Sequence, residues 1–408
     1  MHCTSRNHMQ ILMLLCVAAR KGAYWRALHF ARCLVQRGHH VTLLAISPQN
    51  RLRFRIHQDQ GVTIVETPDL FSGPLRSGWD IWDALRRILW LNGRSAFHLI
   101  HMFDARPVSL LPALYLQKYH HFPLVMDWED WFGRGGSVEE RPNPLIRTIL
   151  RPVETFFEEH FRTRADATTV ICTTLRDKAI TLGVPPHTIQ LVRDGCDVEG
   201  LQPFPTHLSR QYLNLPHDAP LIGYVGVIFQ RDARLMAQAF NQIQAQLPAA
   251  RLLLIGYVNI DIEVMVSHPA AVIRTGFITY EYMNHYICAC DICWLPYHNS
   301  GANRGRWPMK LNDYMAAGRP TVATAVGDVA QVMQMHTIGL LTNDTPEALA
   351  ASVLALLSDV DQRTFLGQNA RQVAEKQFNW QIQTDKLEQL YVQVTAQTTG
   401  HRPGWGHL

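Results

Sequence analysis

The strongest constraint on the fold is an alternation of apolar runs and amphipathic segments that fills both halves of the chain. The apolar runs are short enough to be buried strands, and in the segments between them apolar residues recur every three or four positions, which is typical of helices. This alternation predicts two doubly wound α/β domains, each with a parallel sheet covered by helices. The expected strands are residues 11–17, 41–46, 62–66, 99–103, 124–127, 169–172 and 189–192 in the first half, and 221–225, 252–255, 272–274, 292–295, 321–323 and 339–341 in the second.

A polar stretch containing Pro203, Pro205 and Pro216 separates the two halves and has the composition of a linker. The length of 408 residues also exceeds the size at which a single hydrophobic core stops growing. We therefore expect an N-terminal domain over residues 1–205, a C-terminal domain over 206–378, a last helix over 379–397 and a tail over 398–408.

Charge and composition exclude several classes of protein. Charged residues make up only 18% of the chain, the net charge is +4, and the basic residues are scattered, so neither a disordered chain nor a nucleic-acid-binding protein is expected. The eight cysteines are too sparse for a disulfide framework, which favours a reducing, cytoplasmic setting.

The apolar stretch at residues 11–19 is too short to cross a bilayer, which takes about 20 residues. It follows Arg6 and ends in small residues, like a signal peptide, but we favour a first buried strand because the strand–helix–strand unit needs it. Peripheral contact with the inner face of a membrane stays open. One segment has the aromatic and basic side chains of an interfacial helix, although tryptophans of a helix core explain it equally well: Trp79, Trp82, Arg86, Arg87, Trp90 and Arg94.

Two further groups of residues invite a metal hypothesis. Cys288, Cys290 and Cys293 could supply thiolates to zinc, but a fourth ligand is missing and small buried thiols are the favoured interpretation. The carboxylates of Asp127 and Glu129 could bind Mg²⁺ or Mn²⁺, although two-residue acidic patterns are common.

Loops that follow parallel strands are the expected place for a ligand. Residues 127–136 follow one such strand and combine three carboxylates, two tryptophans and three glycines, which indicates a polar pocket with aromatic walls suited to sugar rings; a solvated acidic loop is the alternative. The loop at residues 18–24 contains the single Gly22, so the glycine-rich dinucleotide motif is absent and NAD binding is disfavoured.

A short helix is expected at residues 309–317, between Pro308 and Gly318. Lys310 lies in its first turn, where a point charge and the free helix amides together suit a phosphate. Asp313 lies on the same side of the helix and could accept hydrogen bonds from a vicinal diol such as a ribose. The alternative is a surface helix on which Lys310 and Asp313 merely pair.

Residues 310–324, KLNDYMAAGRPTVAT, resemble a stretch of family 4 of the retaining glycosyltransferases, a group with the two-domain GT-B fold. Residues 194–197 and 378–380 are also similar to motifs of that family. The similarity covers nearly the whole chain. It implies two Rossmann-like, doubly wound parallel-sheet domains facing a cleft, with the C-terminal helix crossing back onto the first domain.

The resemblance implies transfer of a sugar, with retention, from a nucleoside-diphosphate sugar to a glycan, a lipid-linked saccharide or a small molecule, as in glycan or cell-envelope biosynthesis. Neither a cofactor nor a metal ion is expected. The implied catalytic residues are Asp130, Arg231 and Lys310. The implied donor-binding residues are Gly22, Phe277, Ile278, Arg306, Met309, Leu311 and Asp313, and those on the acceptor side are Asp127, Trp128, Glu129 and Trp131.

The sequence departs from the family pattern at three positions. Gly305 replaces a glutamate, Glu129 a histidine, and Val227 an arginine, which leaves Arg231, Arg304 or Arg306 to supply the second cation. These departures keep open a catalytically degenerate protein that binds a nucleotide sugar or a partner enzyme. A sugar-nucleotide epimerase, which shares the two-domain architecture but not the Lys310 helix, is a third reading.

Overall fold

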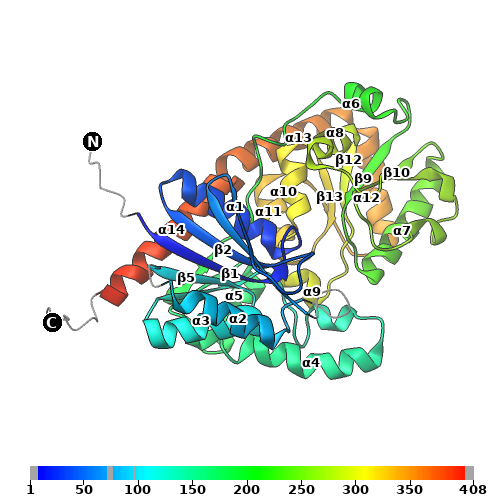
Figure 1. Ribbon diagram of the computed structural model, residues 1–408. Coiled ribbons are helices and arrows are strands. Elements are labelled where there is room, and N and C mark those ends of the chain that lie inside the picture. The colour runs from blue at the N-terminus through cyan, green and yellow to red at the C-terminus, as the bar shows by residue number, and fades with distance from the viewer. Residues whose placement is uncertain (1–7, 71–76, 95–96, 400–408) are drawn as a thin grey trace, which may run out of the picture. The chain divides into compact units, whose positions relative to one another are not determined.

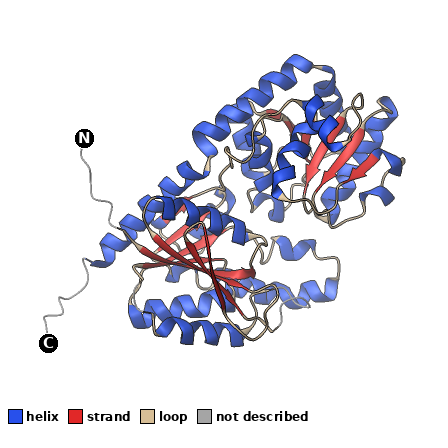
Figure 2. Ribbon diagram, turned by 45° about the horizontal axis from the view of Figure 1, so that its top comes forward, coloured by secondary structure: helices blue, strands red, loops and turns tan. Residues whose placement is uncertain are grey.

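The computed structural model describes residues 8–70, 77–94 and 97–399. The chain divides into two compact units (Figure 1). The first runs to Arg193 and resumes at Gln383, and the second extends from Asp194 to Ile382. Each unit is a sheet of parallel strands with helices on both faces, and the sheet of the first unit adds one antiparallel strand (Figure 2).

The first unit is built on an eight-stranded sheet in the order β3-β4-β2-β1-β5-β6-β7-β8. Its strands are β1 (Gln10–Ala18), β2 (His40–Ile46), β3 (Arg55–Asp59), β4 (Val62–Thr67), β5 (Leu99–Phe103), β6 (Leu124–Trp128), β7 (Ala167–Val170) and β8 (Ile189–Leu191). Its helices are α1 (Ala23–Gln36), α2 (Ile81–Asn92), α3 (Pro107–His120), α4 (Pro144–Glu159) and α5 (Thr173–Thr181). β1 is central because nearly all of its residues are apolar and buried, as a strand covered on both faces requires.

Two strands of this sheet differ from the sequence prediction. β3 was not expected, because it is a polar antiparallel edge strand that is largely exposed and carries no apolar run. β7 begins at Ala167, earlier than the predicted strand at 169–172, because Ala167 pairs with Val125 of β6.

The last helix, α14 (Trp380–Thr399), packs on the first unit from Gln383 onward. The hydroxyl of Tyr391 lies 2.6 Å from Nδ1 of the buried His101 on β5. Glu388 accepts a hydrogen bond from Arg37, which follows α1, at 2.7 Å. These polar contacts fix an otherwise separate C-terminal segment onto both α1 and the sheet.

The second unit is built on a six-stranded parallel sheet in the order β11-β10-β9-β12-β13-β14. Its strands are β9 (Leu221–Val225), β10 (Arg251–Ile255), β11 (Val272–Arg274), β12 (Ile292–Leu295), β13 (Thr321–Thr324) and β14 (Gly339–Thr342). Its helices are α6 (Thr206–Leu213), α7 (Gln230–Gln246), α8 (Tyr280–Ala289), α9 (Gly301–Arg304), α10 (Met309–Ala316), α11 (Gly327–His336), α12 (Pro346–Ser358) and α13 (Val360–Val373). The chain passes from β9 outward to β10 on one side and later returns to β12 on the other, so the switch point of the sheet lies between β9 and β12.

The division between the units lies before the boundary expected at residue 205. Residues 194–205 belong to the second unit, because Asn312 on α10 donates a hydrogen bond to the carbonyl of Gly195 and Arg319 bonds that of Phe204. The prolines in this stretch therefore lie on the surface of a domain rather than in a free linker.

The cysteine cluster lies in the interior of the second unit. Cys288, Cys290 and Cys293 are all buried, and burial raises the pKa of the Cys288 and Cys293 thiols. A Cβ on Gly223 of β9 would lie 2.3 Å from the Cys290 sulfur, so this glycine makes room for the thiol. Within the described ranges, His, Cys, Asp and Glu side chains form no group of three that could hold a metal ion.

No helix of the described residues has the length and apolarity needed to cross a bilayer.

Candidate functional site

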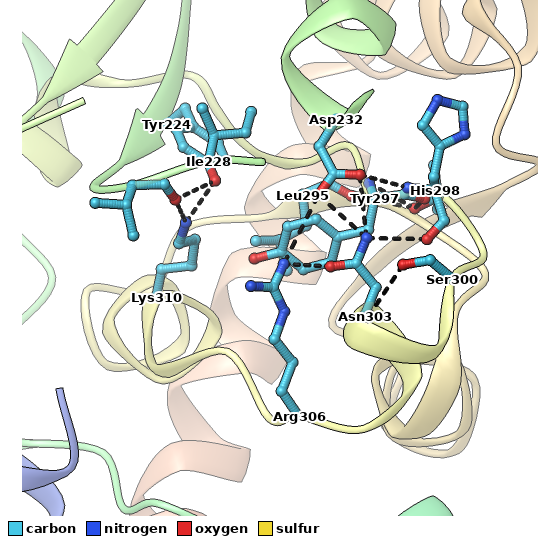
Figure 3. Close-up of polar contacts among 12 residues, drawn as sticks. Tyr224, Ile228, Asp232, Leu295, Tyr297, His298, Ser300, Asn303, Arg306 and Lys310 are labelled. Carbon is cyan, nitrogen blue, oxygen red and sulfur yellow. Dashed lines mark hydrogen bonds and ion pairs between the residues drawn. The ribbon is translucent and has the colours of Figure 1, made fainter. Parts of the chain in front are cut away.

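A polar cluster occupies the carboxyl ends of β9 and β12, at the switch point of the second sheet. Lys310, in the first turn of α10, donates hydrogen bonds from Nζ to the Tyr224 hydroxyl at 2.6 Å and to the carbonyl of Val227 at 3.1 Å. Its ammonium group also lies 4.0 Å from the centroid of the Tyr224 ring (Figure 3). Tyr224 is the fourth residue of β9, so the strand itself holds the lysine in place.

A second cation, Arg306, lies in the loop between α9 and α10 (Figure 3). It contacts the Asn303 side chain, and its Nη2 lies 3.8 Å from Oδ2 of Asp232. Asp232 is buried in the first turn of α7 and accepts hydrogen bonds from the His298 amide and the Asn303 amide group. One buried carboxylate therefore positions the loop that carries Arg306.

The electrostatics of this cluster favour an anionic ligand. Burial and the nearby charge of Arg306 lower the pKa of Lys310 well below its ordinary value. Burial raises the pKa of Asp232, while Arg306 lowers it. Arg306 repels the Lys310 ammonium, while the carboxylates of Asp232 and Asp313 act in the opposite direction. An arriving anion would relieve both the desolvation and the repulsion that act on Lys310.

Asp313 lies one turn further along α10, in an acidic environment. Burial and repulsion by Asp197 raise the pKa of its carboxyl to about 7. Asp197 itself accepts a hydrogen bond from the Tyr280 hydroxyl at 2.8 Å. Within the described part of the chain no hydrogen bond or ion pair joins Lys310 to Asp313, so the structure does not support the alternative of a simple surface pair. Asp313 is partly accessible and can accept hydrogen bonds from a ligand.

An exposed aromatic pair follows the two outer strands at the same edge of the sheet. Phe277, after β11, is 85% exposed and stacks on Tyr257, after β10, with ring centroids 5.1 Å apart. Phe277 and the partly buried Ile278 also line an open cavity of about 590 Å³. Exposed stacked rings of this kind offer a flat surface to another planar ring.

Other residues predicted for the donor side are placed differently by the structure. Arg231 is exposed in the first turn of α7, and Arg306 rather than Arg231 is the guanidinium whose charge acts on Lys310. Leu311 cannot contact a ligand, because its side chain is buried and its amide donates to Pro308; this prediction is corrected. Met309 is partly buried at the start of α10.

In the first unit, the structure corrects the predictions for Asp127 and Trp128. Both are 0% exposed because they are the last residues of β6 and do not belong to the loop. Asp127 forms a bidentate pair with Arg26, with both N···O distances 3.0 Å, and accepts a hydrogen bond from Thr169. The Trp128 indole donates to Glu158 at 2.9 Å. These side chains join β6 to α1, β7 and α4 instead of facing an acceptor.

Asp130, Glu129 and Trp131 do lie in the loop after β6 and are partly exposed. Glu158 of α4 holds this loop by accepting hydrogen bonds from the amides of Phe132 and Gly133, both at 2.7 Å. Position 136 of this loop requires a glycine, because a Cβ there would lie 2.1 Å from the carbonyl oxygen of Trp131.

Asp104 was not predicted as a site residue, although it follows the neighbouring strand β5. It is buried, has a left-handed backbone with φ 56°, and its Oδ1 has no hydrogen-bond partner among the residues that the structure describes. Burial and the charge of Asp130 raise its carboxyl pKa to about 7, against the opposing effect of Arg106. The available signal was an aspartate directly after the apolar run at residues 99–103, at the end of the strand next to β6.

Gly22 is the residue that precedes α1, and its φ of 51° lies in the region that favours glycine. A Cβ there would meet nothing within 4 Å, so the position is open as well as conformationally demanding. The neighbouring Arg20 also has a left-handed φ, of 67°. This loop is therefore sharply bent immediately before the amides of α1.

Comparison with known families assigns both halves of the chain. Residues 21–195 match the family described as glycosyl transferase 4-like domain, and residues 219–359 match that described as glycosyl transferases group 1. The two matches together span most of the chain, and the protein belongs to the group 1, or family 4, glycosyltransferases with the GT-B fold.

Individual relatives are distant. The chain is 26% identical over 239 residues to a D-inositol 3-phosphate glycosyltransferase from Xylanimonas cellulosilytica, and 23% identical over 272 residues to one from Thermobispora bispora. These matches cover 53% and 62% of this chain but only 52% and 60% of the relatives' own lengths.

Solved structures confirm the predicted fold. A sucrose-phosphate synthase from Thermosynechococcus elongatus matches with a TM-score of 0.74 and 20% identity, over 96% of this chain and 100% of that one. HepE from Anabaena, in complex with UDP and glucose, matches with a TM-score of 0.70 and 14% identity, over 95% and 100% of the two chains.

The buried pair between Arg26 and Asp127 yields a prediction about stability. Asp127→Asn should destabilise the first unit by about 3–5 kcal/mol at neutral pH, because the buried guanidinium of Arg26 loses the carboxylate that balances its charge. Burial alone would raise the pKa of Asp127, but Arg26 lowers it below its ordinary value, so the wild-type advantage is present at neutral pH and is lost as pH falls through the folded pKa. Guanidinium unfolding followed by tryptophan fluorescence measures both effects.

The matched control is Asp177→Asn on α5, whose side chain is 66% exposed and which should change the free energy of unfolding by no more than about 0.5 kcal/mol. If Asp127→Asn leaves stability unchanged and instead abolishes ligand binding, Asp127 contacts the ligand and does not serve as a buried structural carboxylate.

Proposed function

We propose that the protein transfers a glycosyl group from a nucleoside-diphosphate sugar to a sugar or lipid-linked acceptor. The observation that carries the proposal is the placement of two cationic side chains, Lys310 and Arg306, at the switch point of the second sheet. Membership of the group 1 glycosyltransferases gives that cationic cluster a specific use, the binding of a donor diphosphate.

In the proposed donor complex, the diphosphate contacts Lys310 and the guanidinium of Arg306, with Arg231 at the start of α7 as a further cation. The ribose diol donates hydrogen bonds to Asp313. The base stacks against Phe277 near Ile278, and Met309 contributes through the free amide end of α10. Support comes from the convergence of these elements at one edge of one sheet.

In the proposed reaction, the bond between the anomeric carbon and the diphosphate breaks, and negative charge develops on the leaving phosphate. Cationic groups fixed before the reaction stabilise that charge more than they stabilise the ground state. The acceptor hydroxyl forms the new bond on the same face, and its proton passes to a phosphate oxygen, which gives retention without a covalent enzyme intermediate. No metal ion is needed in this scheme, because side chains provide the positive charge.

On the first unit, the proposed contacts are Gly22 with the donor phosphate and Asp130 with the reacting sugar. Glu129 and Trp131 remain the proposed acceptor-side residues, because they are partly exposed in the loop that Glu158 holds.

A cytoplasmic site of action is proposed on the low cysteine content alone.

Binding and transfer assays test this proposal. HepE was crystallised with UDP-glucose, and curated relatives are named for inositol phosphate, so these compounds head the donor and acceptor panels. A nucleoside diphosphate should raise the melting temperature by mass action, and transfer should persist in EDTA. Binding without transfer or donor hydrolysis would favour the degenerate protein, for which Gly305, Val227 and Glu129 speak. An epimerised donor formed without acceptor would favour the epimerase.

Lys310→Ala should lower kcat/KM by a factor on the order of 100 or more, because it removes a donor that faces the developing phosphate charge. Steady-state kinetics with the identified donor measures the change. Lys376→Ala, an exposed lysine in the same unit, is the matched control and should have the activity of the wild type. A folded Lys310→Ala enzyme with an unchanged rate would remove the diphosphate from α10.

Asp313→Asn should raise the donor KM with a smaller fall in kcat, because a ribose contact is equally strong in the ground and transition states. In the wild type, the donor KM should fall as pH rises through about 7, since the carboxyl must ionise to accept both hydroxyl hydrogen bonds. The Asn variant should lack this pH dependence. Comparing ribose and deoxyribose donors completes the test: if wild type and variant discriminate equally, Asp313 is not the ribose ligand.

A further inference from the structure

One face of the first unit combines arginine side chains that reach solvent with exposed apolar side chains. It consists of residues 51–56, the outer side of α2 and Arg94, which follows that helix, and we call it the arginine-apolar face. Its arginines are Arg51, Arg53, Arg55, Arg86 and Arg94. Its exposed apolar residues are Leu52, Ile56, Ile81, Trp82, Leu85 and Leu89.

The apolar residues of α2 form a row on the solvent side of the helix. Positions 81, 82, 85 and 89 lie on one side because they are spaced by about one helical turn. Leu89 is 75% exposed and Trp82 is 48% exposed, whereas Ala84 and Leu91 on the other side are buried. A helix that already buries one side in the domain core has no structural reason for a second apolar row.

Residues 51–56 are held against this helix. Arg86 donates a hydrogen bond to the carbonyl of Leu52 at 3.0 Å, and its guanidinium lies 5.3 Å from the Phe54 ring and 5.7 Å from the Trp82 ring. Phe54 in turn stacks on Trp90, with ring centroids 6.0 Å apart. The face is therefore one ordered surface and not a loop that happens to lie near a helix.

The charge on this face is unbalanced. Among the described residues between 50 and 94, the carboxylates of Glu66, Asp69, Asp80 and Asp83 are all buried. The remaining acid, Asp59, accepts hydrogen bonds from Arg32 on α1 at 2.9 and 2.8 Å. The neighbouring helix α3 contains Lys118 and no acidic residue. The arginines of the face therefore have no exposed carboxylate from these elements to neutralise them.

The structure changes which residues of this segment are available. Arg87 is buried and donates hydrogen bonds to Thr67 and to the carbonyl of Leu15, and Trp79 packs edge-on against Phe157. Arg87 therefore belongs to the domain interior, and Trp79 is partly buried. The exposed tryptophan is Trp82, and the exposed arginines include three from residues 51–55, which the helix pattern alone did not indicate.

We propose that the arginine-apolar face binds the surface of a lipid bilayer that contains anionic headgroups. The leucines, isoleucines and Trp82 enter the interfacial region, and the guanidinium groups meet the headgroup phosphates while their stems cover apolar surface. Charge complementarity selects an anionic surface, and the exposed aliphatic row distinguishes a bilayer from a nucleic acid, which would offer no place for it.

A second apolar row on α4 is the competing surface in the same unit. Leu145, Ile146, Ile149, Val153 and Phe156 are exposed there. Charges of both signs surround them, however, and Glu139 and Glu159 are paired with Arg151 and Lys178. Nothing in that charge pattern selects an anionic surface, so α4 serves in the experiment as an alternative to be eliminated.

Sedimentation of the full chain with vesicles tests the proposal. The protein should bind vesicles of phosphatidylcholine mixed with phosphatidylglycerol, and it should bind vesicles of phosphatidylcholine alone far more weakly. Raising the salt concentration should release the protein from the anionic vesicles. Arg53→Gln with Arg55→Gln should lower the partition coefficient about fivefold for each arginine removed. Leu85→Ser with Leu89→Ser should lower the partition coefficient roughly tenfold or more, because serine lacks the apolar side chain whose transfer from water into the bilayer favours binding.

Two control variants each remove one exposed arginine or one exposed apolar side chain elsewhere in the chain. Arg176→Gln on α5, at the other end of the eight-stranded sheet, and Met335→Ser on α11, which is 75% exposed, should bind vesicles like the wild type. Equal binding to neutral and anionic vesicles overturns the proposal. So does loss of binding in Ile149→Ser on α4 while the face variants bind normally, and so does a dimer that Leu89→Ser dissociates without any vesicle binding. Vesicle binding requires no turnover, so its failure is distinguishable from failure of the proposed transfer.

Discussion

Parallel strands end together, and this constraint places every candidate residue of the protein. In the second unit, β9 and β12 are neighbours although a long stretch of chain separates them, so Tyr224 at the end of one meets Lys310 beyond the other. The first turn of α7 supplies Asp232 to the same edge. A cluster assembled in this way depends on strand order, because residues brought together at a switch point are remote in sequence.

The polar groups of that cluster are held in unfavourable charge states. Burial lowers the pKa of Lys310, and burial with acidic neighbours raises the pKa of Asp313 to about 7. A ligand that brings negative charge to the lysine and hydroxyl donors to the aspartate relieves both. The carboxyl ends of these strands therefore suit a ligand that carries both a phosphate and a vicinal diol, as a nucleotide does.

In the first unit, position relative to the strand end decides what a carboxylate does. Asp127 is still within β6, is fully buried and pairs with Arg26, so it stabilises the domain. Asp130 lies beyond the strand and remains partly accessible, and Asp104 occupies the corresponding place after β5 with its Oδ1 unpaired. The arginine-apolar face adds a different surface to the same unit, and the acidic residues of its segment are buried or, in the case of Asp59, paired with Arg32.

The apolar pattern by itself determined the sheet-and-helix order, because buried parallel strands must be nearly continuous in apolar residues; β5, β9, β11 and β12 fall where the pattern places them. The KLNDYMAAGRPTVAT stretch determined the family, and local signals located α10 with Lys310 in its first turn. Only the tertiary structure decided that Arg306 and not Arg231 acts on Lys310, that Leu311, Asp127 and Trp128 are interior, and that β3 closes the edge of the sheet. These outcomes depend on which side of a helix or strand faces the core and on contacts between strands that are remote in sequence. The spacing of residues along the chain gives no information about either.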